Sequence, residues 1–198
     1  MLGLQTFSVI IYHMTREEAL ELIRERIKNP NSIKHMLATE AIMRALAINF
    51  EEDPEIWGLA GLLHDLDMED EDCLTDPCQH GNKSADELDI LGIEKKITDA
   101  IRAHNEKSGK VPENLIEKCL YATDPLTGLI VASTLVLPSK KLADLKLESL
   151  MRRFKESRFA MGARREAMIT CSSFNMDLEK FLDIGLKAMQ EIAIDLGL

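Results

Sequence analysis

Hydrophobic residues recur at helical spacing near the beginning of the chain. Over 14–27 the apolar positions repeat every three to four residues, after Thr15 and Glu18, which have the spacing of a capping box. The sequence NPN at 29–31 interrupts this pattern, and a second apolar stripe runs over 32–49. We therefore expect two successive helices with a short connection between them.

The same pattern continues through the rest of the chain. Asp53-Pro54 places a proline at the first turn of a helix, and Gly92 ends another, because glycine is favoured just beyond a helix C-terminus. Further helices are expected over 55–64, 80–92, 94–104 and 112–130, with two or three more between 143 and 197. Alternating patterns long enough for strands are absent. The sequence predicts an all-α fold, a single bundle of about eight helices.

The length and charge of the chain limit its function. With 198 residues it can form one domain with a hydrophobic core. Residues 1–13 carry no helical period and are expected to be an N-terminal extension, so that the domain spans 14–198. A formal net charge of −10 opposes binding to nucleic-acid polymers. A small phosphorylated substrate stays feasible, because a local metal cluster can outweigh the overall charge.

Other features bear on the surroundings of the protein. No stretch reaches the roughly 18 apolar residues of a membrane helix, and the N-terminal sequence lacks the basic region of a signal peptide. The four cysteines form no CxxC pair and are expected to be reduced thiols. We expect a cytoplasmic protein with no membrane partner. A homodimer is compatible with the sequence.

The candidate chemistry lies in histidines and neighbouring carboxylates. The chain has five histidines, and four of them fall at or near the boundaries of expected helices, whereas His13 lies in the extension. A single histidine on a helix is more often a structural residue than a ligand. Asp65 directly follows His64, however, and Asp124 lies in the apolar segment YATDPLTGLI. Imidazole and carboxylate groups together are the ligands of divalent first-row metals.

The order of these residues along the chain is H…HD…D. The segments HMLATEAIMRAL, GLAGLLHDLD and YATDPLTGLIVA resemble the motifs of the HD-domain superfamily of metal-dependent phosphohydrolases. The histidines of CQHGNKSA and AIRAHN resemble the added ligands of members with two metals. The GYP motif of cyclic-dinucleotide phosphodiesterases is absent, and HGNKSA differs from the HAPxGA-like segment that diadenosine-tetraphosphate hydrolases usually have at this place. The chain therefore looks most like small prokaryotic HD proteins of unassigned substrate.

This resemblance implies a metal centre with one or two divalent ions, such as Fe, Mn, Zn, Ni or Co. Its expected ligands are His35, His64, Asp65, His80, His104 and Asp124. The family pattern assigns His35, His64 and Asp124 to one ion and His80 and His104 to the other, with Asp65 as the catalytic bridge. A metal-bound hydroxide would attack the phosphorus of a small phosphate ester or nucleotide.

Other polar residues are candidates for catalysis and substrate binding. Lys83 lies one turn after His80, so that it either holds a substrate phosphate and assists catalysis or is a solvated lysine. Asp67 is expected to act as a general acid or base, or to orient a ligand histidine. The further substrate-binding candidates are Asn105, Lys140, Lys141 and Arg152. The simpler interpretation of these basic residues, and of Arg164, is that they belong to a solvated helical face.

Two other classes of protein compete with a hydrolase. One is an HD-type di-iron oxygenase, because the same ligands serve redox chemistry. The other is a non-catalytic module that binds a metal or a ligand. A module that had lost its chemistry would be expected to lose ligands, and here the set is complete, which favours an enzyme.

Overall fold

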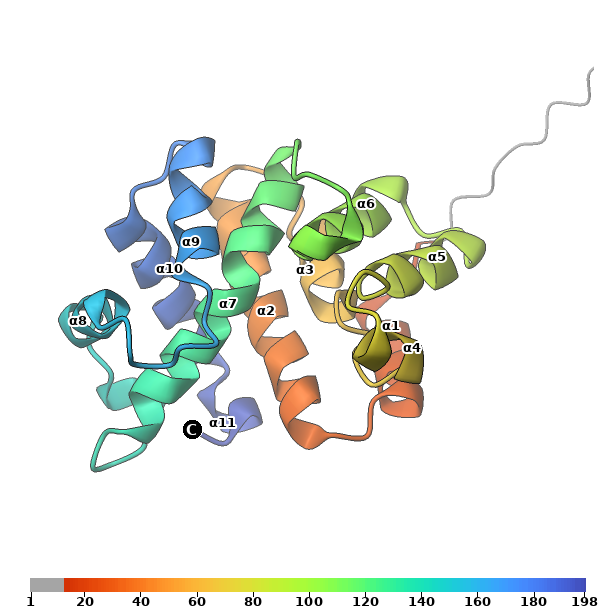
Figure 1. Ribbon diagram of the computed structural model, residues 1–198. Coiled ribbons are helices and arrows are strands. Elements are labelled where there is room, and N and C mark those ends of the chain that lie inside the picture. The colour runs from red at the N-terminus through yellow and green to blue at the C-terminus, as the bar shows by residue number, and fades with distance from the viewer. Residues whose placement is uncertain (1–12) are drawn as a thin grey trace, which may run out of the picture.

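A computed structural model describes residues 13–198 of the chain, and in this part all regular structure is helical (Figure 1). The α-helices are α1 (Arg16–Arg26), α2 (Pro30–Asn49), α3 (Pro54–Leu63), α4 (Glu71–Thr75), α5 (Asn82–Ile90), α6 (Lys95–His104), α7 (Leu115–Leu135), α8 (Leu147–Lys155), α9 (Arg165–Met168), α10 (Leu178–Glu191) and α11 (Ala193–Leu196). Three short 3₁₀ segments are η1 (Glu106–Ser108), η2 (Leu142–Asp144) and η3 (Ile169–Phe174).

The two longest helices, α2 and α7, form the centre of the molecule. In Figure 1, α1 and α3 to α6 lie on one side of this pair, and α8 to α10 lie on the other. Helix α2 packs against α3, α7 and α10, while α6 packs against α5 and α7. Side chains from these helices form one hydrophobic core, whose residues range from Ala19 to Leu196 along the chain. The metal-ligand candidates lie where the first group of helices meets α7.

The predicted all-α fold is confirmed. Eight of the α-helices have nine or more residues, and the other three, α4, α9 and α11, have four or five. Helices of that length contain about one turn and carry no usable periodicity. The capping box is also confirmed: the Thr15 hydroxyl accepts from the Glu18 amide, and the Glu18 carboxylate accepts from the Thr15 amide.

Three helix starts differ from the sequence prediction by two or three residues, and one of them is α5, which begins at Asn82 rather than at His80. Helix α2 begins at Pro30, within the NPN sequence that was expected to separate two helices. Asn29 caps this helix through its side chain, and proline in the first turn costs nothing because its missing amide would have no partner there. Helix α7 begins at Leu115 rather than at Pro112, with a capping box between Asn114 and Glu117.

Helices α2 and α3 approach each other closely at Gly61. A Cβ atom at this position would lie 2.9 Å from the main-chain carbon and oxygen of Thr39. Glycine therefore allows the two backbones to touch about one turn away from His35 on α2 and from His64 at the end of α3. This contact determines how the end of α3 faces α2.

The remaining expectations concern single features. All four cysteines are free thiols, of which Cys78 is exposed, as the sequence predicted. Within residues 13–198, no helix combines the length and the apolar character that a membrane crossing requires. The expected extension, apart from His13, lies outside the described residues.

Candidate metal centre

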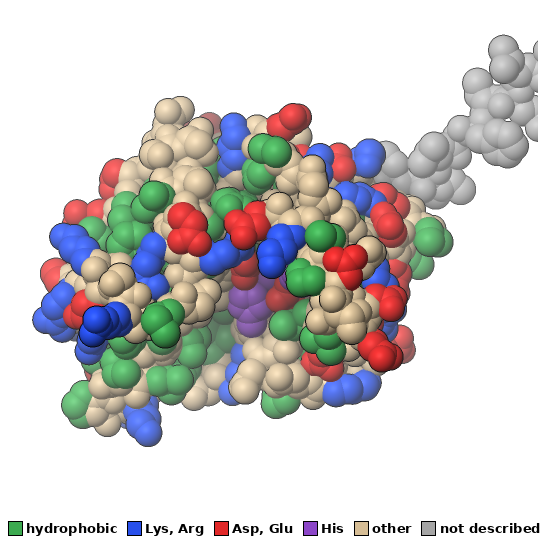
Figure 2. Space-filling view, viewed as in Figure 1, with side chains coloured by type: hydrophobic (Ala, Val, Ile, Leu, Met, Phe, Trp, Pro, Cys, Tyr) green, Lys and Arg blue, Asp and Glu red, His purple; other side chains and the backbone are tan. Residues whose placement is uncertain are grey.

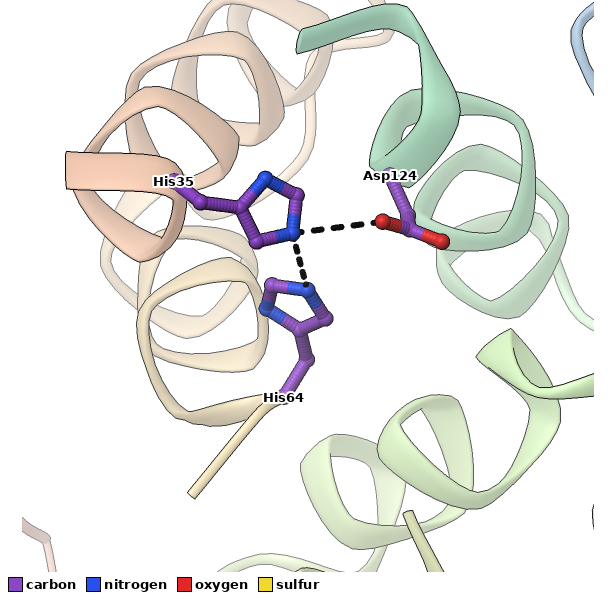
Figure 3. Close-up of side chains that lie close together, drawn as sticks. All are labelled: His35, His64 and Asp124. Atoms are coloured by element: carbon purple, nitrogen blue, oxygen red, sulfur yellow. Dashed lines mark hydrogen bonds and ion pairs between the residues drawn. The ribbon is translucent and has the colours of Figure 1, made fainter. Parts of the chain in front are cut away.

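Six polar side chains come together from five segments of the chain. His35 lies on α2, His64 and Asp65 end α3, His80 lies in the turn before α5, His104 ends α6, and Asp124 lies on α7. Figure 3 shows three of them, His35, His64 and Asp124, pointing toward one another. These are the six residues for which the sequence suggested a metal site.

The first group consists of His35, His64 and Asp124. The Nε2 atoms of His35 and His64 are 3.1 Å apart, and His35 Nε2 lies 3.2 Å from Asp124 Oδ1. His64 is fully buried. The ligand atoms of all three residues lie within 4.8 Å of one another, as does a second set made of His64, Asp65 and His104.

Asp65 is the central residue of the cluster. Its Oδ2 lies 3.3 Å from His35 Nε2. Its Oδ1 lies 3.2 Å from the Nε2 atoms of both His64 and His80, and 3.5 Å from that of His104. The two oxygens thus face different histidines, which is the arrangement that a bridging carboxylate needs.

His80 and His104 form the other flank. Their Nε2 atoms are 3.1 Å apart. Gly81, which separates His80 from α5, has a φ of +80°, and a Cβ there would lie 2.9 Å from the Ile101 oxygen. Both its backbone conformation and its close packing therefore require glycine, and together they hold the turn with His80 against α6.

In each of the four rings the second nitrogen, Nδ1, is bound to the protein. The acceptors, at 2.5–2.8 Å, are Thr127 Oγ1 for His35, Gly61 O for His64, Asp67 Oδ1 for His80 and Ile101 O for His104. Carbonyl and carboxylate oxygens only accept, and the Thr127 hydroxyl already donates to Asp124 O at 2.9 Å. Each Nδ1 therefore carries a proton, and in the neutral form of each ring, which a metal ion requires, Nε2 directs its lone pair into the cluster.

The carboxylates make the centre attractive to positive charge. Burial lowers the pKa of His35, but hydrogen bonds to Asp124 and Asp65 outweigh it and raise the pKa to about 10. In contrast, burial lowers the pKa of His64 to about 4. Burial raises the pKa of Asp65, but the surrounding imidazoles have the larger effect and keep this pKa well below its usual range. A divalent cation would supply the charge that these buried carboxylates require.

The spacing of the donor atoms fits such a cation. Two nitrogens that are each about 2.1 Å from one ion lie roughly 3.0–3.4 Å apart, for right-angled or tetrahedral coordination. The Nε2–Nε2 distances of 3.1 Å fall within this range. Four imidazoles and two carboxylates are suited to Mn, Fe, Co, Ni or Zn. The residues present therefore fit a site for divalent metal.

A comparison with known families identifies this arrangement. A family model described as HD domain matches residues 32–129. Residues 32–129 belong to the HD-domain superfamily. This superfamily consists mostly of metal-dependent hydrolases, and all six candidate ligands lie within the matched residues. No curated protein and no solved structure matches the chain.

In this HD domain Asp67 contacts His80 rather than the cavities beside the centre. One of its oxygens accepts from His80 Nδ1 at 2.7 Å, and the other accepts from the amides of Gly81 and Ser84 at 2.8 and 2.9 Å. The side chain is buried. These contacts favour the orienting role that the sequence suggested for Asp67, because they occupy both oxygens and leave none for proton transfer to a substrate.

Lys83 lines none of the described cavities beside the centre, contrary to the phosphate-binding alternative that the sequence offered. Its ammonium lies 2.9 Å from both Asp70 and Asp72, and these carboxylates raise its pKa. Helix α5 begins at Asn82, after the turn at Gly81, so the helical spacing from His80 to Lys83 does not apply. The lysine thus holds the start of α4 against α5.

The other substrate-binding candidates fall into two groups. Asn105 lines a cavity with His80 and His104, but its amide donates to Pro77 O and His80 O and thereby fixes the turn. Lys140 and Lys141 are exposed beyond the end of α7, and Arg152 lines a separate groove on α8. Neither these two lysines nor Arg152 lines a described cavity that contains a candidate ligand.

Sequence reasoning missed two residues that contact the ligands. Thr127 was not singled out, although it lies one turn after Asp124. Arg164 was assigned to a solvated face, whereas its guanidinium donates to Asp124 Oδ2 at 3.0 Å and lies 5.2 Å from the ring centre of Tyr121. The spacing from Asp124 could have indicated Thr127, but nothing near Arg164 in the sequence indicates its distant partner.

Open space adjoins the centre on both sides. A polar cavity of about 350 Å³ is lined by His80, His104, Asp124, Lys107 and Arg164, among others. A second cavity of about 540 Å³ adjoins His35 and Thr127. In Figure 2 histidine side chains are visible at the base of a hollow in the middle of this face, with basic and acidic side chains beside them. A small molecule can therefore reach the cluster from solvent.

Proposed function

We propose that this protein is a metal-dependent hydrolase of a small phosphate ester or nucleotide. The observation that carries the proposal is the convergence of four Nε2 atoms around the Asp65 carboxylate, with every Nδ1 fixed by an acceptor. We assign one or two divalent first-row ions to His35, His64, Asp65, His80, His104 and Asp124. Bound there, the metal would supply Lewis acidity and lower the pKa of water toward neutrality.

The chain itself contributes positioning and charge. Asp67 and Thr127 orient His80 and His35, so that these rings keep their tautomer and direction. Arg164 donates a hydrogen bond to Asp124, and both Arg164 and Lys107 line the polar cavity. A guanidinium suits bidentate contact with phosphate, and Arg164 would hold the phosphoryl oxygens next to the centre. Because the chain has a formal net charge of −10, an anionic substrate needs such local cations.

The first test is metal analysis together with activity. We expect one or two first-row ions per chain in protein purified without chelator, and loss of metal and of phosphatase activity in His64→Ala and Asp65→Ala. His13→Ala is the matched control, because His13 is exposed and its nearest charged partner is Glu94 at 3.7 Å. Activity would be measured on 4-nitrophenyl phosphate and a panel of nucleotides.

The same experiment separates the proposal from its alternatives. Full metal content in both His64→Ala and Asp65→Ala would refute the assigned site. A metal content that falls by one ion in His80→Ala and His104→Ala would support a dinuclear centre. Iron with substrate-dependent oxygen consumption and no release of phosphate would instead support the di-iron oxygenase.

A further inference from the structure

The cavity next to His35 differs in character from the polar one. It lies between α2, α7 and α11, and its volume of about 540 Å³ is in the range of small-molecule sites. Apolar side chains make up most of its lining, namely Ala38, Val131, Ala132, Leu135, Leu196 and Leu198. Its polar groups are Asn31, Lys34, His35 and Thr127. No carboxylate side chain is among the lining residues, although the chain has 34 Asp and Glu.

The cavity adjoins the candidate metal centre. His35 and Thr127 line it, and both also line a smaller cavity of about 350 Å³ that reaches Asp124. Asp124 in turn lines the polar cavity with Arg164. A ligand whose anionic group lies at the centre can therefore extend along α7 into apolar surroundings.

Gly128 is the strongest indication that the cavity is kept open for a ligand. It lies in the interior of α7, where glycine is less favourable than alanine by up to about 1 kcal/mol. A Cβ atom at Gly128 would meet no other atom within 4 Å, so packing does not require glycine. A side chain there would instead enter the space that Gly128 lines together with His35 and Thr127.

Lys34 makes the cavity suitable for an anionic ligand. It is the only lysine or arginine in the lining, and its ammonium forms no ion pair within residues 13–198. Most other lysines and arginines near the centre already have carboxylate partners, as Lys83 and Arg164 do. An uncompensated cation beside an apolar wall favours a ligand that has one negative group and an apolar body.

We propose that the cavity between α2, α7 and α11 binds the alcohol part of the substrate, and that this part is an alkyl chain or an apolar ring rather than a sugar. The inference rests on the proposed function, since it places the phosphate of the same ester at the metal centre. It names the substrate class: phosphate monoesters of apolar alcohols. The small residues Ala38, Gly128 and Ala132 leave room for the alcohol, and the leucines cover it.

The test uses binding of non-hydrolysable alkylphosphonates to the manganese-loaded protein by calorimetry. We expect the dissociation constant to fall from methyl- to butyl- to hexylphosphonate by about two- to four-fold per methylene, because each buried methylene adds apolar burial. Gly128→Leu fills the cavity and should abolish this dependence on chain length. Gly128→Ala adds one methyl group and should reduce it partially.

Two further variants control for poor folding and for the addition of a leucine as such. Ala132→Leu fills the cavity one turn further along α7 and should act as Gly128→Leu does, even if one of the two folds poorly. Lys96→Leu adds a leucine on the exposed surface of α6 and should leave the dependence on chain length intact. Equal affinities across the wild-type series, or a chain-length dependence that survives both cavity-filling variants, would overturn the inference.

Hydrolysis of the matching alkyl phosphates distinguishes failure of the inference from failure of the proposed function. Turnover that is equal for methyl, butyl and hexyl phosphate would preserve the hydrolase and reject the apolar site. Affinity that rises with chain length, without release of phosphate from any ester, would preserve the apolar site and reject the hydrolase.

Discussion

The four imidazoles of the cluster are held by acceptors of different chemistry. Main-chain carbonyls hold His64 and His104, and no side-chain substitution removes them. Side chains hold the other two rings, Thr127 for His35 and Asp67 for His80. The contribution of ring orientation can therefore be measured at these two residues alone.

Thr127→Val removes the acceptor of His35 Nδ1 and keeps the shape of the side chain. We expect metal affinity to fall about 10- to 100-fold, because the ring can then turn or exchange its tautomer. Competition with a chelator of known affinity measures the change. Thr123→Val on the same helix is the control, since the buried Thr123 hydroxyl has no hydrogen-bond partner among the described residues. Equal metal affinity in Thr127→Val and the wild type would disprove this role.

At the scale of single residues, the sequence revealed the candidate ligands but not the residues that support them. His64 and Asp65 were recognisable because two polar groups end an apolar helix and follow a known order of motifs. Arg164 was not, because its contact with Asp124 spans 40 positions and depends on how the segment before α9 crosses α7. Local spacing carries no information about such a contact.

At the scale of elements, the approach of α2 to α3 positions the cluster. His64 Nδ1 binds the oxygen of Gly61, and the Thr39 hydroxyl binds the oxygen of His35, so the two histidines are attached to the point where the helices touch. A wider spacing would separate the Nε2 atoms, which are now 3.1 Å apart.

Gly61→Ala tests this dependence. The added Cβ would overlap main-chain atoms of Thr39 and Glu40, which cannot move independently, and we expect the free energy of unfolding to fall by about 1–3 kcal/mol. Metal affinity should fall as well. Gly162→Ala is the control, because a Cβ atom at this position would meet no atom of another residue within 4 Å. Denaturant unfolding and metal titration of both variants measure the effects, and a Gly61→Ala protein as stable as the wild type would contradict the argument.

The existence of the elements was more predictable than their ends. Amphipathic periodicity identified the helices with nine or more residues, since burial of one face determines them. The starts of α2 and α7 were misplaced by prolines, which fit equally well just before a helix or in its first turn. Helices of one turn, such as α4, form through contacts with the rest of the molecule.

At the scale of the whole molecule, the metal centre joins helices that are far apart in the sequence. Its residues lie between positions 35 and 124 and belong to α2, α3, α6, α7 and the turn before α5. An ion bound there would connect both helices of the central pair to the helices on one side of it, so metal binding and global stability should be linked.

Removal of metal should therefore lower the melting temperature. A site saturated at about 100 times its dissociation constant adds about 2.7 kcal/mol to the stability, which corresponds to roughly 5–10 °C for a chain of this size. Thermal unfolding with and without chelator measures the shift, and His64→Ala should show none. A chelator effect of the same size in His64→Ala would show that the ion acts elsewhere.

The metal cluster and a part of the lining of the cavities beside it come from different regions of the chain. All six candidate ligands precede residue 125, whereas Arg164, Leu196 and Leu198 come from the last third. If the proposed roles hold, exchange of α11 and the residues after it would change which ester is accepted, while Arg164 and the six candidate ligands stay in place. Proteins of this architecture could then diversify their substrates through their C-terminal helices while they inherit an unaltered reaction centre.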